Sequence, residues 1–229
     1  MARRLYELAG AAPARRFSPY CWRIRMALAH KGLEAECVPW RFTEGAALAF
    51  SGQDKVPVLV DGGRVVSDSW AIASYLEAAY PERPALFAGG DPRPARFLAA
   101  WADTVLNAGL VRLIVSDIPR WLEPAQAAYF RQSREARLGM SLEALTEGRE
   151  ARLPAFRASL APLRLVLREQ PFLGGARPDY GDYAVFGSLQ WARCVSALGL
   201  FEAGDPILGW RERMLDLFGG LARDVPHCG

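Results

Sequence analysis

The chain has 229 residues, a net charge of +3 and 51% hydrophobic residues, which is enough for one large or two modest domains with a buried core. Charged residues make up 23% and the basic ones are scattered along the whole chain, so a disordered chain and a nucleic-acid-binding stripe are both excluded. The uninterrupted apolar runs are far shorter than the roughly 20 residues of a membrane span. We therefore expect no membrane segment, and no apolar signal core follows the N-terminus.

The cysteines and histidines bear on redox chemistry and metals. The four cysteines are scattered without a CxxC pair: Cys21, Cys37, Cys194 and Cys228. Such spacing favours free thiols and a reducing cytoplasm over a disulfide framework. With only two histidines in the chain, a Cys/His metal site has little support, and we expect no metal.

The first 80 residues alternate between strand and helix signals. The expected elements are a strand at 4–8, a helix at 18–30, a strand at 34–39, a short helix at 43–50, a hairpin at 56–66 and a helix from 67 to about 80. Ser18 as N-cap, Pro19 at the first helical position and Gly32 just past the end mark the first helix. The order is β-α-β-α-β-β-α.

The second half of the chain carries helical signals only. The segment 82–94 contains three prolines and a Gly-Gly pair, which is typical of a linker. Helical periodicity follows at 95–115, 124–148, 153–169, 179–197 and 206–218, with a turn at 172–175. We therefore predict an α/β domain over residues 1–82 and an all-α domain over residues 93–229.

This arrangement resembles the cytosolic glutathione transferases, and four motifs carry the resemblance. Ser18-Pro19-Tyr20 matches the place of the family's thiol-activating residue, and Val56-Pro57 matches its cis-proline dipeptide. Asp68-Ser69 matches the pair that holds the γ-glutamyl end of glutathione. The run 179–182 matches the helix-capping box, with Asp179 in place of the usual hydroxyl residue. The resemblance implies a thioredoxin-like N-terminal domain, glutathione as co-substrate and a homodimer.

Within the family, three short runs are similar to the bacterial lignin β-etherase branch and its fungal relatives. These runs are residues 18–23, 29–32 and 68–70. This narrower resemblance implies reductive cleavage of a β-aryl ether, in which the glutathione thiolate displaces a phenolate from the carbon next to a ketone.

Ser18 is the candidate catalytic residue. A thiol near pKa 8.5 is mostly protonated at neutral pH, and a helix N-terminus with an added hydroxyl donor favours its thiolate. Ser18 could instead be an N-cap alone, and the two roles do not exclude each other. Relatives with cysteine at this position act as reductases through a mixed disulfide, which serine cannot form. Cys21, one turn on, is either a small buried residue or a redox thiol.

The other glutathione contacts are expected along the rest of the α/β domain. Next to Pro57, the backbone of Val56 would pair with the cysteinyl residue as a strand edge does. Ser69 and the helix N-terminus behind it would hold the γ-glutamyl carboxylate, with Asp68 on the ammonium. Lys55, or less directly Gln53, would meet the glycyl carboxylate. The alternatives are a trans proline opening an edge strand, a plain helix cap and a solvated surface lysine.

The electrophile is expected between the two domains. Tyr20, Trp101 and Trp121 are the candidate pocket residues, with Leu106, Leu113 and Tyr129 as further members of the wall. Aromatic residues at helical spacing can equally be core.

We therefore predict a glutathione transferase in which a thiolate stabilised by Ser18 attacks a hydrophobic aromatic electrophile. The alternatives are a glutathione-dependent isomerase, a thiol reductase that depends on Cys21, and a non-catalytic carrier of hydrophobic aromatic ligands.

Overall fold

The computed structural model of the chain describes residues 3–228. Its N-terminal part is built on a four-stranded sheet with strand order β2-β1-β3-β4. The strands are β1 (Arg4–Leu8), β2 (Glu36–Trp40), β3 (Val58–Asp61) and β4 (Arg64–Ser67). β1 pairs in parallel with β2 and antiparallel with β3, which pairs antiparallel with β4. The predicted element order and the thioredoxin-like arrangement are confirmed.

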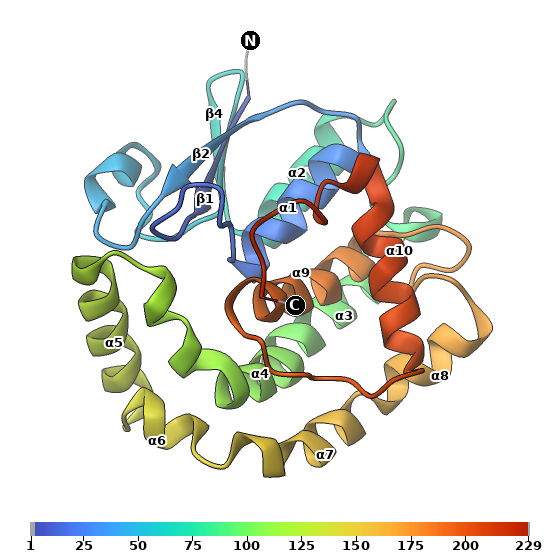
Figure 1. Cartoon of the computed structure of the whole chain (residues 1–229). Coiled ribbons are helices and arrows are strands. Elements are labelled where there is room, and N and C mark those ends of the chain that lie inside the picture. The colour runs from blue at the N-terminus through green and yellow to red at the C-terminus, as the bar shows by residue number, and fades with distance from the viewer. Residues whose placement is uncertain (1–2, 229) are drawn as a thin grey trace.

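Two helices and a 3₁₀ turn complete this half. Helices α1 (Pro19–His30) and α2 (Ser69–Ala79) pack together beside the sheet, as Figure 1 shows. Helix α1 begins and ends where its predicted capping residues place it. The Ser18 side chain caps its first turn, and Gly32 adopts a positive φ of 63° just past its end. The expected short helix is the 3₁₀ helix η1 (Gly45–Ser51).

The hairpin between β3 and β4 is shorter than the sequence indicates. Strand β3 begins at Val58 and not at Val56, because Pro57 has no N–H to donate to a neighbouring strand. The two strands turn at Gly62 and Gly63, with φ values of 58° and 90°. Two successive positive φ values match the right-handed twist of a two-residue hairpin.

The second half is entirely helical. Its elements are the short 3₁₀ helix η2 (Ala88–Gly90), α3 (Pro92–Trp101), the π-helical segment η3 (Ala102–Leu106), α4 (Asn107–Ile114), the 3₁₀ turns η4 (Val115–Asp117) and η5 (Pro119–Trp121), α5 (Pro124–Leu138), α6 (Leu142–Thr146), α7 (Arg149–Ser159), α8 (Ala161–Glu169), α9 (Tyr180–Val195) and α10 (Pro206–Gly220). The stretch expected over 124–148 is divided after Leu138 by Gly139, which adopts a φ of 74°. Every residue of α9 is buried, so this helix forms the centre of the domain.

The long helical segment Pro92–Asp117 differs from the sequence expectation. By length and composition alone it could cross a membrane, although Arg96 and Asp103 interrupt its apolar runs. Its small and apolar residues Ala95, Ala99 and Leu106 are buried, and α3 packs along α9. Such burial is what the core helix of a folded domain shows.

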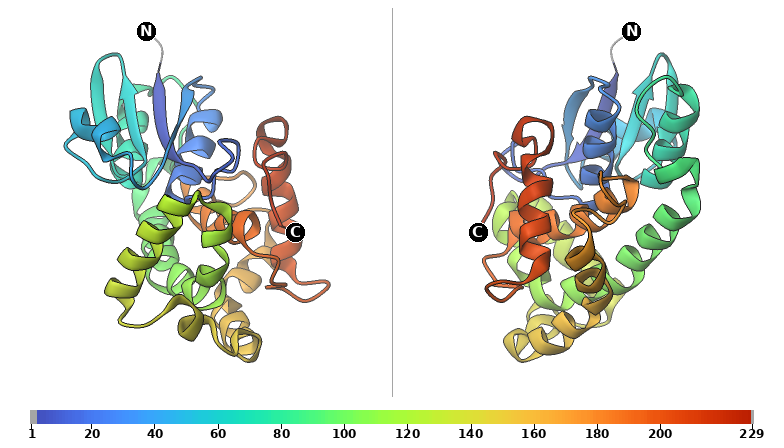
Figure 2. Two further views of the ribbon diagram at one scale, coloured as in Figure 1. Left: turned by 60° about the vertical axis from the view of Figure 1, so that its left-hand side comes forward. Right: turned by 90° about the vertical axis from the view of Figure 1, so that its right-hand side faces the viewer.

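Helix α9 joins the two halves. It packs along α1, and Gly187 lies so close to the Pro19 carbonyl that any side chain there would collide with it. The Tyr180 hydroxyl donates to the carbonyl of Ser69 at 2.9 Å, at the start of α2. Figure 2 shows the sheet and the helical half stacked end to end. The start of each N-terminal helix is thereby fastened to the helical half.

We propose residues 1–82 and 93–229 as the two domains. Helix α2 ends at Ala79 and α3 begins at Pro92, which supports a boundary in the predicted linker. Residues 1, 2 and 229 lie outside the described part of the chain.

Candidate active site

A cavity of about 470 Å³ lies where the two halves meet. The N-terminal half lines it with Leu8, Phe17, Ser18, Pro19, Tyr20, Trp40, Phe42, Asp54, Lys55 and Val56. The helical half lines it with Asp103, Asn107, Ala108, Val111, Val115, Ile118, Tyr129, Phe130, Arg134, Arg137 and Trp191. The cavity therefore combines polar groups from the start of α1 and the loop before β3 with an aromatic wall from both halves.

Ser18 lies at the N-terminus of α1, in the lining of this cavity. Its side chain is only 5% exposed, and its Oγ accepts a hydrogen bond from the Cys21 backbone N–H at 3.2 Å. A hydroxyl that accepts in this way still has its own hydrogen to donate. A sulfur atom in the cavity beside Ser18 would meet that hydroxyl and the positive end of the helix dipole.

Cys21 is buried below the first turn and is absent from the cavity lining. Burial, together with the negative charge of Glu7, raises the pKa of the Cys21 thiol to about 12. The reactive form of cysteine is the thiolate. A thiol held in its neutral form is a small apolar residue, and this arrangement counts against a redox role.

The peptide bond between Val56 and Pro57 is cis, in agreement with the motif. Val56 lines the cavity, and among the described residues its N–H and C=O have no hydrogen-bond partner. Free backbone groups of this kind can pair with an extended peptide. The register that places Val58 opposite Ser67 brings the start of α2 beside this segment.

Asp68 and Ser69 form the start of α2. Asp68 has a φ of 76°, a conformation that costs energy for a residue other than glycine and often occurs at binding sites. Its Oδ1 accepts from the N–H groups of Trp70 and Ala71 at 2.9 and 3.0 Å. Ser69 is buried. One carboxylate oxygen of Asp68 is therefore occupied by capping, and the other has no hydrogen-bond partner among residues 3–228.

The structure brings some of the predicted glutathione residues to the cavity and leaves others beside it. Lys55 and Val56 line the cavity with Ser18. The residues outside the lining are Gln53, Pro57, Asp68 and Ser69. Gln53 is exposed, and its backbone N–H donates to Ser51 Oγ at 3.2 Å.

Tyr20 lines the cavity next to Ser18. The Arg23 guanidinium lies 4.8 Å from its ring centroid. Burial, followed by the negative charge of Asp103, raises the pKa of the Tyr20 phenol. The phenol is therefore protonated at neutral pH and can donate a hydrogen bond.

Comparison with known proteins adds to this geometry. A family model described as the glutathione S-transferase N-terminal domain matches residues 17–79, and one described as the C-terminal domain of the same family matches residues 95–204. The chain belongs to the glutathione S-transferase family. The two matched segments fall on the α/β half and the helical half of the chain.

Two curated relatives match over shorter segments, whereas a probable glutathione S-transferase of Oryza sativa is 26% identical over 211 residues, 86% of this chain and 80% of the relative. A zeta-class glutathione S-transferase of Euphorbia esula is 42% identical over 84 residues, which is 34% of this chain and 37% of the relative. A maleylacetoacetate isomerase of Pseudomonas aeruginosa is 40% identical over 83 residues, which is 33% of this chain and 39% of the relative. The chain spans about a third of the length of these two relatives.

Two solved fungal structures are similar over nearly the whole chain. Glutathione transferase GSTFuA3 of Phanerochaete chrysosporium superposes with a TM-score of 0.78 at 25% identity, covering 96% of this chain and 92% of that chain. Glutathione S-transferase CsGST63524 of Ceriporiopsis subvermispora, solved in complex with glutathione, gives 0.80 at 24% identity and covers 99% of both chains. These likenesses agree with the observed fold.

Two of the pocket residues predicted from the sequence lie outside the cavity lining. Trp121 does not line the cavity, because its Nε1 donates to the Val195 carbonyl at 2.8 Å and its ring lies 3.7 Å from the Arg15 guanidinium carbon. Trp101 is likewise absent from the lining and packs against the core. Of the further candidates Tyr129 does line the cavity, whereas Leu106 and Leu113 are core residues.

The aromatic wall is built largely from residues that the sequence did not single out. The Phe42 ring is stacked with Tyr129 at a centroid distance of 6.2 Å and tilted against Phe130 at 5.5 Å. Trp40 and Trp191 complete the wall. These residues come from β2, the loop after it, α5 and α9, so no local pattern groups them.

Polar residues of the π-helical region were also missed. Asp103 accepts from Arg23 at 2.7 Å, and Asn107 lies one turn further along the same face. The Asn107 Oδ1 is buried and receives no hydrogen bond from the described residues. Their spacing of four places them in one stripe with Val111 and Val115. Polar residues in such an apolar stripe are the signal that could have found them.

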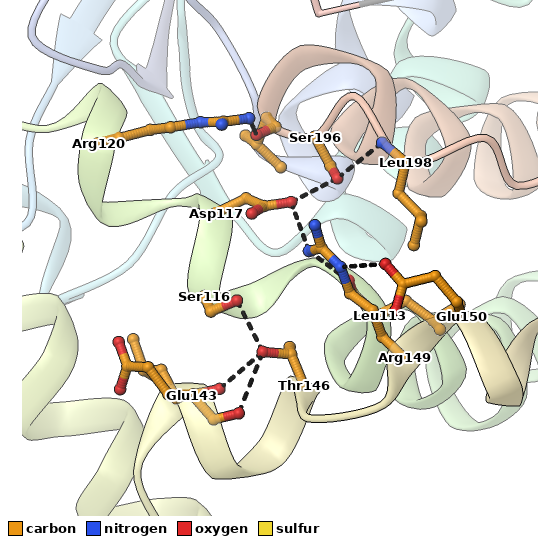
Figure 3. A network of polar contacts seen from close by, with 12 residues as sticks. Leu113, Ser116, Asp117, Arg120, Glu143, Thr146, Arg149, Glu150, Ser196 and Leu198 are labelled. Atoms are coloured by element: carbon orange, nitrogen blue, oxygen red, sulfur yellow. Dashed lines mark hydrogen bonds and ion pairs between the residues drawn. The ribbon is translucent and has the colours of Figure 1, made fainter.

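A separate polar network supports the far side of the cavity, and Figure 3 shows it. Asp117 accepts from the Arg149 guanidinium at 2.8 Å and from the Ser196 hydroxyl. These contacts tie the turn that follows α4 to α7 and to the C-terminal end of α9. Because Asp117 lies between Val115 and Ile118, the network fixes two lining residues in place.

Proposed function

We propose that this transferase binds glutathione with its sulfur beside Ser18 and joins it to a hydrophobic aromatic electrophile in the cavity. The observation that carries the proposal is the position of the Ser18 hydroxyl and the α1 N-terminus. Both open into a cavity whose lining includes aromatic side chains from both halves of the chain. The family membership supports glutathione as the co-substrate.

The chemistry begins with the thiolate. The Ser18 hydroxyl donates to the sulfur while its oxygen accepts from the Cys21 N–H, and the helix N-terminus stabilises the negative charge. The thiolate then attacks an electrophilic carbon of the second substrate. For a β-aryl ether, the C–S bond forms as the C–O bond breaks, and the electron pair leaves on a phenolate. The protonated Tyr20 phenol is the candidate donor to that oxygen.

The rest of glutathione extends from Ser18 toward the sheet. The free backbone groups of Val56, beside Pro57, pair with the cysteinyl residue. The start of α2 at Ser69 takes the γ-glutamyl carboxylate, and the free oxygen of Asp68 takes the ammonium. Lys55, or Gln53, meets the glycyl carboxylate.

The test is the ultraviolet absorbance of the thiolate as glutathione is titrated into wild type, Ser18→Ala and Ser18→Thr across pH. Wild type is expected to ionise the bound thiol well below its solution pKa. Losing one hydrogen bond to a charged group costs about 1.5–3 kcal/mol, so Ser18→Ala should raise that pKa by about 1–2 units. The turnover of Ser18→Ala, as kcat/KM, should fall by about 10- to 100-fold.

Two controls separate this outcome from a folding defect. Ser18→Thr keeps both the cap and the hydroxyl and should retain most of the ionisation. Cys21→Ala should leave ionisation unchanged, because its thiol lies outside the cavity. Glutathione that binds without ionising would overturn catalysis and favour a carrier, and glutathione that does not bind would overturn the site.

A glutathione-dependent isomerase is the second candidate. The zeta-class transferase and the maleylacetoacetate isomerase among the relatives support it. An isomerase returns glutathione unchanged, whereas a transferase consumes it, so following glutathione during turnover separates the two. Our other alternative, a thiol reductase, is disfavoured by the burial of Cys21.

Three finer expectations remain proposals. The etherase-like activity is in keeping with the likeness to fungal transferases of the same fold. A homodimer follows from the family resemblance alone. A cytoplasmic location is in keeping with the four cysteines, which are all free thiols.

A further inference from the structure

Helix α5 presents two arginines to the cavity. Arg134 and Arg137 both line it, together with Phe130 from the same helix. Their spacings of four and three residues put the three side chains on one face of α5. From the sequence this segment is only a polar helix. The structure shows that the face with these three residues is turned toward the cavity.

The two guanidinium groups lack a counter-ion. Among the described residues, the ion pairs made by α5 belong to Arg131, which lies 2.8 Å from Glu135 and 2.7 Å from Glu143. Arg134 and Arg137 have no carboxylate within ion-pair distance there. Arg134 is half-buried and Arg137 is exposed at the cavity mouth. A half-buried charge without a partner is costly, and neither arginine belongs to the ion-pair network of the described residues.

Arg134 is held in place by the aromatic wall. Its guanidinium carbon lies 4.9 Å from the ring centroid of Phe130 and 5.4 Å from that of Phe42, and its Nη1 donates to Ser133 Oγ at 3.1 Å. Burial and the nearby charge of Arg137 lower the pKa of Arg134. An anion in the cavity would offset the repulsion between the two arginines and favour the charged form of Arg134.

The carboxylates that line the same cavity do not supply this anion. Asp103 is already paired with Arg23 at 2.7 Å. Asp54 is exposed on the loop before β3 and makes no ion pair within the described part of the chain. The charge that Arg134 and Arg137 lack is therefore left for a ligand to bring.

We infer that the cavity selects flat aromatic ligands that carry a carboxylate, with Arg134 and Arg137 as the counter-ions. The rings of Phe42, Tyr129 and Phe130 take the aromatic part, and the guanidinium groups pair with the carboxylate. The claim that this ligand is also the electrophile rests on the proposed function. Binding of the ligand itself does not.

The experiment compares 2-naphthoate with its neutral isostere 2-naphthamide by isothermal titration calorimetry. Wild type should bind the naphthoate at least about 10-fold more tightly, since an ion pair shielded from water exceeds 1.4 kcal/mol. Arg134→Gln and Arg137→Gln should each remove most of this preference and leave naphthamide binding unchanged. Arg168→Gln, an exposed arginine on α8 outside the cavity lining, makes the same charge change and should alter neither affinity.

Several outcomes would overturn the inference. Equal affinity of wild type for the two ligands would do so. Equal loss of both ligands in the two variants would show a packing role in place of charge recognition. A loss of glutathione affinity with the naphthoate preference intact would assign the arginines to a glutathione carboxylate. Because Arg134 also packs on rings, the more exposed Arg137 keeps the test independent of folding.

The same experiment separates this inference from the proposed function. A naphthoate preference that disappears in both variants, in a protein that does not ionise glutathione, would support the subsite and reject the transferase. Thiolate formation without any naphthoate preference would support the transferase and reject the subsite.

Discussion

Ser18 and Cys21 show how one helical turn separates a candidate catalytic group from an inert one. Both lie at the start of α1, yet Ser18 lines the cavity and Cys21 points into the core. The single hydrogen bond between them, from the Cys21 N–H to Ser18 Oγ, serves the helix cap and leaves the hydroxyl hydrogen free. The sequence left both roles of Ser18 open, and this geometry allows both.

Cys21 should resist alkylation in the folded protein. With its pKa raised to about 12, the thiolate fraction at pH 8 falls roughly 10³-fold below that of a free cysteine. Iodoacetamide labelling followed by peptide mass spectrometry should find Cys21 modified only after unfolding in urea. Cys228, which is partly exposed, is the matched control and should react first. Rapid native labelling of Cys21 would return the thiol reductase to consideration.

At the scale of elements, α9 positions the two helix starts that carry the proposed glutathione residues. It meets α1 at Gly187 and Pro19, and it meets α2 through the Tyr180 hydroxyl and the Ser69 carbonyl. Its own start is fixed by the predicted capping box, which is confirmed with aspartate at the cap position. The helical half therefore positions the proposed glutathione residues through one central helix.

Replacing Gly187 should disturb this contact. A Cβ there would collide with the Pro19 carbonyl and lie 3.3 Å from Arg23 Cγ, so Gly187→Ala should lower the free energy of unfolding by about 1–3 kcal/mol. The start of α1 should move with it, and thiolate formation at Ser18 should weaken. Urea unfolding and the glutathione titration check both effects.

Gly209→Ala on α10 is the matched control for this change. Its nearest neighbour is the flexible end of Arg213 at 3.6 Å, so the gain in helix propensity should leave stability equal or raise it by about 0.5–1 kcal/mol. Equal behaviour of the two variants would contradict the close contact between α1 and α9.

Several cysteine and tyrosine side chains across the molecule have raised pKa values because the fold takes them out of water. Burial raises the pKa values of Cys21, Tyr180 and Cys194 to about 12 and that of Cys37 to about 11. In the unfolded chain these groups ionise near their ordinary values, at about 8.5 for cysteine and about 10 for tyrosine. The folded chain therefore keeps protons that the unfolded chain has already released.

The free energy of unfolding should fall as pH rises from about 9 toward 12. For each such group the loss is about 1.4 kcal/mol per pH unit once the unfolded form has ionised, and below pH 8 these groups should contribute no slope. Urea unfolding at pH 8, 9, 10 and 11 measures this dependence. Cys21→Ala should reduce the slope of the free energy of unfolding against pH by about 1.4 kcal/mol per pH unit, because one such proton is removed. A stability that stays constant or rises over this range would contradict the burial of these protons.

The order of elements in the α/β domain follows from local signals. The Ser-Pro pair at the start of α1, the paired glycines at the hairpin and the Asp-Ser pair at the start of α2 act over a few residues. Such signals depend on backbone conformation nearby, so they can be read from the sequence. The π-helical segment inside 95–115 has no comparable signal in the sequence, and in the fold it packs against α9.

The sequence by itself therefore determined the fold class and the start of α1 at Ser18, and the family resemblance implied the cis bond before Pro57 that the structure shows. Only the tertiary structure decided which side chains line the cavity. It selected Trp40 and Trp191 in place of Trp101 and Trp121, and it turned a basic face of α5 toward the aromatic rings. The physical reason is that local signals act within a turn of chain, whereas the cavity is made by residues up to 183 positions apart, from Leu8 to Trp191, that meet only when the two halves pack together.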